Sequence, residues 1–411
     1  MKKLAWLALT VGFTAACSGT SSIDEQSPDV EGAQGAEPEA DRIAPKDDPR
    51  KLIPEATFAL KDVVSKDDVG KTFMVPEERM PYPDTYWPFT QGGVDAVWLT
   101  GSASPLEKFV RQVSPGSLSA AKQWEHANHG KGLPGVAEWF GHCPGWAAAA
   151  VTGNTVRHPV NAMFQGGRMV ECTAGSAGCE TYQIGDINAL AAETYVDADS
   201  DFIGARCDTK PTDIKLDAFG RIVREQGGGG CQGLNAGSLM VVLAHRLKMA
   251  SLPFVINAQT PRNTDEIWNQ PAAGYKVYRY QTVTMEQAAQ LVSQGVTHRG
   301  YQWNSAAKAF AFVEIGLYWI TENGPNTRLV SGRKSMKETK MSAILELDSP
   351  TNSQIIGGEY LPDASRGESR LSVAPFAWTA KGPGPDNGGG SDGHNPHIRS
   401  SLVQQLIELG K

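Results

Sequence analysis

The sequence predicts an α+β fold, and two observations carry this prediction. Helical periodicity comes mostly in the first half of the folded part of the chain, and strand-like alternation of apolar and polar residues comes mostly later. Two of the later strands are joined by a loop rich in turn residues, which is typical of an antiparallel hairpin. The 411 residues divide into a leader over 1–17, a tether over 18–50 and one folded domain over 51–411.

The leader has the pattern of a bacterial lipoprotein signal. Two lysines precede an apolar run over 4–13, and small residues precede Cys17. The apolar run is too short to span a bilayer as a mature helix. We therefore expect Cys17 to be lipidated and to anchor the chain in the bacterial cell envelope. Ser18 lacks the aspartate associated with inner-membrane retention, which favours the outer membrane; an ordinary secretory signal and a secreted protein are the alternative.

The tether is acidic and has no aromatic residue. Nine acidic and three basic residues lie between Ser21 and Arg50, among Ser, Ala, Gly and Pro. Such a segment buries too little apolar surface to fold, so it is predicted to be disordered. The whole chain has a formal charge of −7 and no cluster of basic residues. This charge distribution argues against a nucleic-acid partner.

The stretch from Trp139 to Val151 contains the residue that we expect to carry the chemistry. An alanine-rich helix begins just after Pro144, and proline is favoured at the first helical position. Cys143 is then the N-cap residue, beside the positive end of the helix dipole, where a thiolate is stabilised. Papain-like and transglutaminase-like enzymes place their thiol nucleophile at such a helix start. The alternative is a small buried cysteine beside Trp146.

Four of the other cysteines are candidates for disulfide bonds. In an oxidising compartment Cys172 and Cys179 can form one disulfide, and Cys207 and Cys231 another. This pairing leaves Cys143 as the remaining thiol of the folded domain, which favours its role as a nucleophile.

The remaining elements follow from periodicity along the chain. Apolar residues at helical spacing predict helices over 186–195, 238–247 and 397–409. Alternation predicts strands over 275–284, 310–321, 343–347 and 355–360, of which the last two form the hairpin.

Together these segments resemble the transglutaminase elicitor family, the oomycete-type transglutaminases with bacterial relatives. The most distinctive match is the Cys-Pro-Gly-Trp core that begins at Cys143. Further matches occur in the same order over 87–95, 104–108, 139–146, 186–190, 202–207, 267–271, 274–275, 345–348, 356–360 and 395–398.

The resemblance implies a papain/transglutaminase-like core and acyl transfer at protein-bound glutamine. The thiolate of Cys143 attacks the side-chain amide, ammonia leaves, and a thioester forms. A primary amine, from lysine or a polyamine, then gives an isopeptide bond, whereas water gives glutamate. The partners are thus protein glutamine side chains and primary amines, and no metal or organic cofactor is expected. The sulfur must be open to the incoming amide, and it needs a proton carrier and donors for the oxyanion.

The chain departs from the family pattern where the proton carrier is expected. Met240 stands at the position of the expected histidine, and Asn257 stands at that of an aspartate on the following strand. His245 is the nearest replacement along the chain, although it lies on another face of the same predicted helix. Asn257 can orient a histidine, as asparagine does in papain-like enzymes.

Two other functions therefore remain beside the acyltransferase. A family member with impaired catalysis can act as a surface-anchored binding lipoprotein. A cysteine peptidase, which shares the thioester chemistry, is the third possibility. A metal site at Glu125, His126 and His129 is not favoured because a further matched ligand is missing from the sequence pattern.

Overall fold

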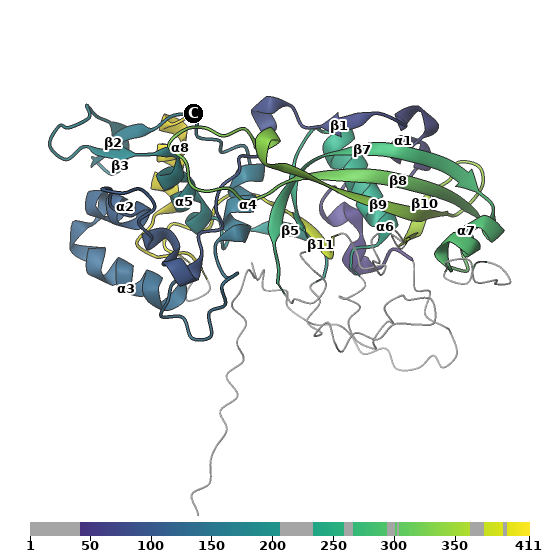
Figure 1. Ribbon diagram of the computed structural model, residues 1–411, viewed down its shortest axis with the longest axis horizontal. Coiled ribbons are helices and arrows are strands. Elements are labelled where there is room, and N and C mark those ends of the chain that lie inside the picture. Colours follow the sequence, from purple (N-terminus) through teal and green to yellow (C-terminus); the bar gives the residue numbers. More distant parts are fainter. Residues whose placement is uncertain are drawn as a thin grey trace, which may run out of the picture.

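The structure is a computed structural model that describes residues 42–205, 233–258, 266–293, 301, 304–361, 374–388 and 393–411. Figure 1 shows a helical lobe on one side, a large twisted sheet on the other, and α4 (Cys143–Val151) between them. The mixture of helices and antiparallel sheet agrees with the predicted α+β class. Within the described ranges, no helix is long and apolar enough to cross a membrane.

Among the described residues, the large sheet has eight strands, and all of their pairings are antiparallel. In spatial order the main path is β10 (Ile355–Tyr360), β9 (Met336–Leu347), β8 (Ala309–Ile320), β7 (Asn269–Val283), β6 (Phe254–Asn257), β11 (Phe376–Ala380) and β5 (Ser200–Gly204). The short strand β1 (Thr72–Met74) pairs with β7 beyond the end of β6. The first part of β7 is buried on both faces because other elements cover the sheet there.

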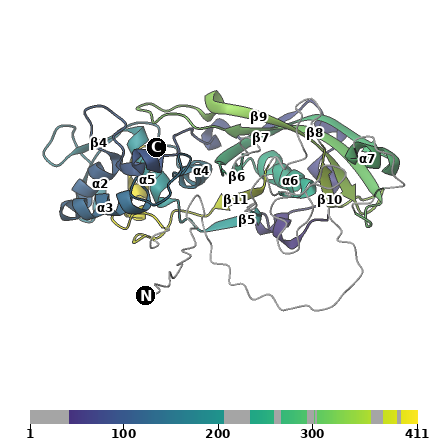
Figure 2. The same cartoon turned by 60° about the horizontal axis from the view of Figure 1, so that its bottom comes forward.

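In the part of the chain that the structure describes, the helical lobe combines four helices with a small sheet. The helices are α2 (Pro105–Val113), α3 (Leu118–Asn128), α5 (Ile184–Thr194) and α8 (Ser400–Leu409), and the sheet has β2 (Val160–Gln165), β3 (Arg168–Glu171) and β4 (Glu180–Tyr182). Figure 2 shows the other described helices near the large sheet: α6 (Ala236–Leu243) crosses beneath it and α7 (Met285–Val292) lies at its far end. The short helix α1 (Leu60–Val63) also lies on the sheet side.

Most predicted elements occur close to their expected places. The hairpin is formed by β9 and β10, with Leu347 opposite Ile355. The helix expected over 238–247 ends as an α-helix at Leu243 and continues as a π-helical segment over Ala244–Met249. The last helix begins at Ser400, three residues later than predicted, because Asn395 and His397 make a separate turn before it.

The folded domain begins earlier than residue 51. Arg42 forms a bridge with Gly357, and the backbone N–H of Ile43 donates to the carbonyl of Ile356. These contacts attach the segment to the edge strand β10, while Asp47 is buried. Residues 42–50, which the composition placed in the tether, therefore belong to the folded body; edge-strand pairing compensates for their lack of large apolar side chains.

Helix α4 is buried on all sides between the two lobes. Every residue from Cys143 to Ala150 is buried, and the helix packs against α5 on one side and against β6, β7 and β11 on the other. Gly145 permits this close packing. A Cβ atom at Gly145 would lie 1.8 Å from the carbonyl oxygen of Ala192 in α5.

We expect Gly145→Ala to reduce the unfolding free energy by about 3 kcal/mol or more, because the clash is with backbone that cannot rotate away. Thermal unfolding of the purified protein measures this change. Gly116→Ala is the matched control, since nothing lies within 4 Å of the added carbon there, and we expect it to stay within about 0.5 kcal/mol of the original. Equal melting temperatures for the two variants would contradict the packing of α4 on α5.

Candidate active site

The start of α4 is fixed by hydrogen bonds to the segment before it in the sequence. The backbone N–H of His142 donates to the carbonyl of Tyr86 at 2.6 Å, and the indole N–H of Trp146 donates to the carbonyl of Tyr82 at 3.1 Å. His142 is the N-cap and Cys143 the first helical residue, so the helix begins one residue earlier than predicted. The sulfur of Cys143 thus lies in the first turn, at the positive end of the helix dipole.

The sulfur faces the beginning of β7. Its Sγ lies 3.8 Å from the carbonyl oxygen of Ile267, to which the thiol can donate, and 3.8 Å from Nδ2 of Asn269. The indole N–H of Trp378 in β11 donates to Oδ1 of Asn269 at 2.9 Å. Because an indole is only a donor, this bond requires the amide oxygen to face Trp378, and the NH₂ group is thereby directed at the sulfur.

Cys143 has no exposed side-chain surface. The expected chemistry requires a sulfur that is open to an incoming amide, and the structure corrects this expectation, because α4 is enclosed between the lobes. The rings of Tyr86 and Trp268 pack edge to face with centroids 5.2 Å apart, and both side chains are partly exposed. The backbone carbonyl of Tyr86 accepts the N–H of His142, and Trp268 follows Ile267, whose carbonyl faces the sulfur, so both residues are close along the chain to the contacts at the start of α4.

The two other predicted site residues lie in different places. Asn257 is opposite Asn269 in the β6–β7 ladder, and its Oδ1 accepts the backbone N–H of Trp268 at 3.0 Å. His245 is in the π-helical segment, and its Nε2 lies 3.0 Å from the backbone nitrogen of Thr57 and 3.1 Å from the carbonyl oxygen of Thr57. Asn257 thus borders the surroundings of the thiol, whereas the His245 imidazole is engaged with the early part of the folded chain.

Met240, at the position of the expected histidine, is buried in α6. Cys172 and Cys179 form a disulfide in the loop between β3 and β4. Cys17, Cys207 and Cys231 lie outside the described residues, as does the Cys207–Cys231 pairing.

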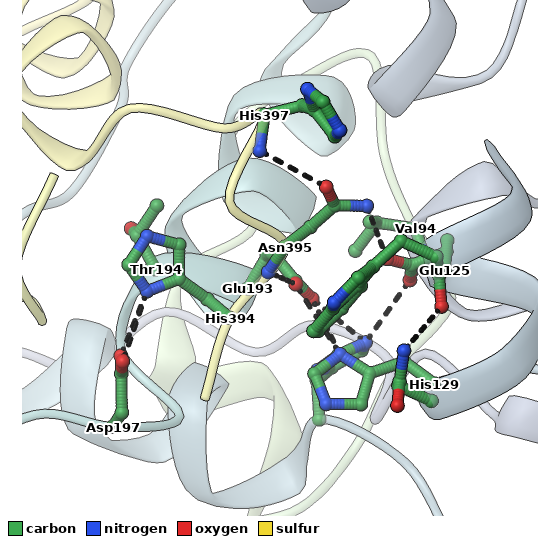
Figure 3. A network of polar contacts seen from close by, with 12 residues as sticks. Val94, Glu125, His129, Glu193, Thr194, Asp197, His394, Asn395 and His397 are labelled. Carbon is green, nitrogen blue, oxygen red and sulfur yellow. Dashed lines mark hydrogen bonds and ion pairs between the residues drawn. The ribbon is translucent and has the colours of Figure 1, made fainter. Parts of the chain in front are cut away.

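A second group of polar side chains lies on the helical side of the α4 start. Figure 3 shows Glu125, His129 and Glu193 turned toward one another, with Asn395 beside them. His142 completes the group, with Nε2 at 3.1 Å from Oε2 of Glu193 and 3.6 Å from Oε1 of Glu125. Nδ1 of His129 lies 3.3 Å from both carboxylate oxygens of Glu193.

The side chains of this group affect one another's ionisation. Burial, reinforced by the charge of Glu193, raises the pKa of Glu125 well above its usual value. Burial would also raise the pKa of Glu193, but His129 and His142 outweigh it and the pKa is lowered. Burial lowers the pKa of His142 and favours the neutral imidazole. Burial in this group therefore favours the neutral form of Glu125, whereas the two imidazoles favour the ionised form of Glu193.

Two comparisons with known proteins bear on this arrangement. Residues 114–388 match the transglutaminase elicitor family, a span that includes Cys143, Asn269 and Trp378. The chain belongs to the transglutaminase elicitor family. Its fold is similar to that of the crystal structure of the GP42 transglutaminase from Phytophthora sojae, with a TM-score of 0.58 and 20% identity over 86% of this chain and 94% of that chain. No curated protein matches the sequence.

The surroundings of the Cys143 sulfur include two residues, Asn269 and Trp378, that the sequence alone did not place in the site. Asn269 occurs in one of the motifs that carry the family resemblance, whereas Trp378 lies outside the matched segments. Neither has a spacing relative to Cys143 that indicates a contact. Antiparallel pairing of β6 with both β7 and β11 brings the two side chains together.

A buried carboxyl group lies in the segment that holds α4. Asp84 accepts the backbone N–H of Thr85 at 2.7 Å, and its backbone carbonyl accepts the N–H of Asn323. Burial raises the pKa of Asp84 from 3.8 to about 7, against hydrogen bonds from Thr85 and Asn188 that favour the ionised form. Between these two pKa values, the folded protein therefore binds more protons at this group than the unfolded chain does.

Because of Asp84, we expect the free energy of unfolding to fall by up to about 4 kcal/mol as the pH rises from about 4 to about 7. Asp84→Asn removes this dependence, so its stability relative to the original should increase toward high pH. Urea unfolding at about pH 5 and about pH 8 measures the difference. The exposed Asp67→Asn is the control; curves for Asp84→Asn that run parallel to those of the original would contradict the burial of an ionisable group.

Proposed function

We propose that this protein is a protein-glutamine acyltransferase that uses Cys143 as its nucleophile. The observation that carries the proposal is the contact of the Cys143 sulfur, in the first turn of a buried helix, with an amide NH₂ group held in one orientation. Membership of the transglutaminase elicitor family supports the general kind of activity. The proposal includes a papain-like arrangement of the core around α4.

The acyl transfer proceeds in two stages. Sγ of Cys143 attacks the side-chain carbonyl carbon of a protein-bound glutamine, the carbon–nitrogen bond breaks, and the amide nitrogen leaves as ammonia with the thiol proton. A lysine or polyamine nitrogen then attacks the thioester, loses a proton and regenerates the thiol, which leaves an isopeptide bond. Water in place of the amine yields glutamate.

Asn269 is suited to stabilise the charge that develops in each stage. The tetrahedral intermediate carries a negative oxygen next to the sulfur, and the Asn269 NH₂ group already lies 3.8 Å from that sulfur. Its orientation is set before the reaction by Trp378, so no hydrogen-bond reorganisation is needed at the moment of charge development. Trp378 acts as a positioning residue in this proposal.

The buried position of Cys143 requires a local opening before glutamine can reach the sulfur. The proposal assigns this opening to the Tyr86–Trp268 pair, since both rings are partly exposed and both residues adjoin the contacts that fix the α4 start. Closure after binding would exclude water and favour amine attack over hydrolysis.

Incorporation of a biotin-labelled primary amine into a glutamine-rich protein tests the acyltransferase. Cys143→Ala should abolish incorporation, and Asn269→Ala should lower kcat about 10²–10³-fold, as loss of an oxyanion donor does elsewhere. Trp378→Phe removes the orienting N–H together with part of the ring system and leaves the Asn269 amide in place, so it should lower kcat by less. Circular dichroism and melting temperature show that each variant is folded.

The same assay separates the alternatives. Equal signals from the original protein and Cys143→Ala would reject the acyltransferase. Ammonia release without amine incorporation would identify a deamidase, and cleavage of peptide bonds would identify a cysteine peptidase. Met240 favours the second candidate function, a binding protein without turnover, because general acid–base help is worth about 10²–10⁴-fold in rate. That candidate predicts binding of glutamine-containing proteins that is unaffected by Cys143→Ala.

The proposal also includes a lipid anchor at Cys17, which would hold the folded domain at the bacterial cell envelope, on the outer membrane. Radiolabelled fatty acid should enter the original protein and not Cys17→Ala, and the variant should move from the membrane fraction to the soluble fraction. Equal labelling of the two proteins would reject the anchor, and secretion would then be the remaining interpretation.

A further inference from the structure

Four ionisable side chains meet inside the helical lobe, and they come from three separate segments of the chain. Glu125 and His129 are at the end of α3 and just after it, His142 is the N-cap of α4, and Glu193 is in α5. The exposed fraction is 0% for Glu125, His142 and Glu193 and 6% for His129. Burial of so many ionisable groups is costly unless they are paired or hold a metal ion.

The geometry of the four side chains is convergent. One ligand atom from each, a ring nitrogen or a carboxylate oxygen, lies within 4.8 Å of all the others. Nε2 of His142 lies 3.1 Å from Glu193 and 3.6 Å from Glu125. Tetrahedral ligands bound at about 2.0–2.1 Å are about 3.3 Å apart. The shorter separations match such a site, and the widest, up to 4.8 Å, would have to shorten by about 1.5 Å on metal binding.

We propose that Glu125, His129, His142 and Glu193 bind one divalent transition-metal ion, with Zn²⁺ as the expected ion. Two imidazoles and two carboxylates are a ligand set suited to Zn²⁺, whereas Ca²⁺ and Mg²⁺ prefer oxygen ligands alone. Two carboxylates, two neutral imidazoles and a divalent cation sum to zero charge. The ion would therefore neutralise the carboxylates within a region that water does not reach.

His142 supplies an independent observation that points to a ligand. Its side chain is fully buried, and neither ring nitrogen has a hydrogen-bond partner of acceptable geometry among the described residues. Nε2 nevertheless lies within 3.6 Å of a carboxylate oxygen of both Glu125 and Glu193. A metal ion at this point would give the nitrogen lone pair a partner.

The carboxylates are held by further contacts around the site. The backbone N–H of Val94 donates to Oε1 of Glu125 at 3.1 Å, and the Asn395 side chain donates to Oε2 of the same residue at 3.2 Å. The backbone N–H of Asn395 donates to Oε1 of Glu193 at 2.5 Å. Hydrogen bonds of this kind orient carboxylate ligands in metal sites.

Gly93 closes one side of the site. A Cβ atom there would lie 2.6 Å from Oε1 of Glu125 and 3.3 Å from Nε2 of His142, and 2.5 Å from the carbonyl oxygen of His129. The backbone of Gly93 also has a φ of +57°, which few other residues adopt. The chain therefore approaches the ligands closely where only glycine fits.

The proposed metal ion would connect the helical lobe to the start of α4. His142 directly precedes Cys143, and its backbone N–H is bonded to Tyr86. Metal binding would thus hold the N-cap of the buried helix from the side of α3 and α5. This structural role is independent of the acyl-transfer proposal.

The test uses the full chain carrying Cys143→Ala, so that the thiol cannot bind the metal and no result depends on acyl transfer. The protein is produced with added zinc, purified without a metal-affinity step, and analysed for metal by mass spectrometry. We expect one Zn²⁺ per chain and a melting temperature that falls on chelation and returns with Zn²⁺. Co²⁺ in place of Zn²⁺ should give the intense visible absorption of a four-coordinate site.

Matched variants assign the ion to the four side chains. Glu125→Gln and His129→Gln should each weaken Zn²⁺ binding at least 100-fold and abolish the effect of chelation on the melting temperature. His126→Gln is the control, because His126 is exposed on the same helix, and it should leave both unchanged. Gly93→Ala provides a further variant that keeps all four ligands and narrows the space beside them, and it should also weaken binding.

Two outcomes would overturn the proposal. One is a folded parent protein that contains no transition metal and does not bind Zn²⁺ or Co²⁺ at micromolar concentration. The other is equal loss of binding in Glu125→Gln and His126→Gln, which would place the ion elsewhere. Variants that fail to fold would leave the metal content and the Co²⁺ spectrum of the parent to decide.

Discussion

The packing of α4 between α5 and the large sheet is the constraint on which both polar sites depend. Gly145 allows the helix to approach Ala192 so closely that no side chain fits between them. The helix is buried on all sides, and protein groups accept hydrogen bonds at its start: Tyr86 accepts the backbone N–H of the N-cap His142, and Tyr82 accepts the indole N–H of Trp146. The position of Cys143 is a consequence of this packing.

The sulfur of Cys143 contacts the side-chain amide of Asn269, which belongs to the large sheet. Asn269 and Trp378 are far apart in the sequence, yet the order β7–β6–β11 places them together. A buried amide with its oxygen already bonded can present its hydrogens in one direction only. The proposed chemistry needs such a fixed hydrogen-bond donor beside the sulfur. The same burial removes direct solvent access to the thiol.

The helical side of the same turn carries the buried group of two glutamates and two histidines. The sequence pattern suggested a metal site at Glu125, His126 and His129, which was not favoured because the pattern lacked a further ligand. Residues at i and i+4 share a helix face, whereas the residue at i+1 points away. The structure accordingly leaves His126 exposed and brings His142 and Glu193 to the site instead, which no spacing along α3 indicates.

The sequence by itself determined the α+β class, the hairpin of β9 and β10, the presence of a helix next to Cys143, and the family, because local periodicity, proline position and motif order are properties of contiguous residues. It placed the end of the tether too late, since edge pairing of Arg42 with Gly357 is not local. Only the tertiary structure decided that Cys143 is buried, that Asn269 faces it, and that His245 lies against Thr57. These contacts join segments more than a hundred residues apart, and the packing of α4 between the lobes brings the two polar sites to opposite sides of one helix start.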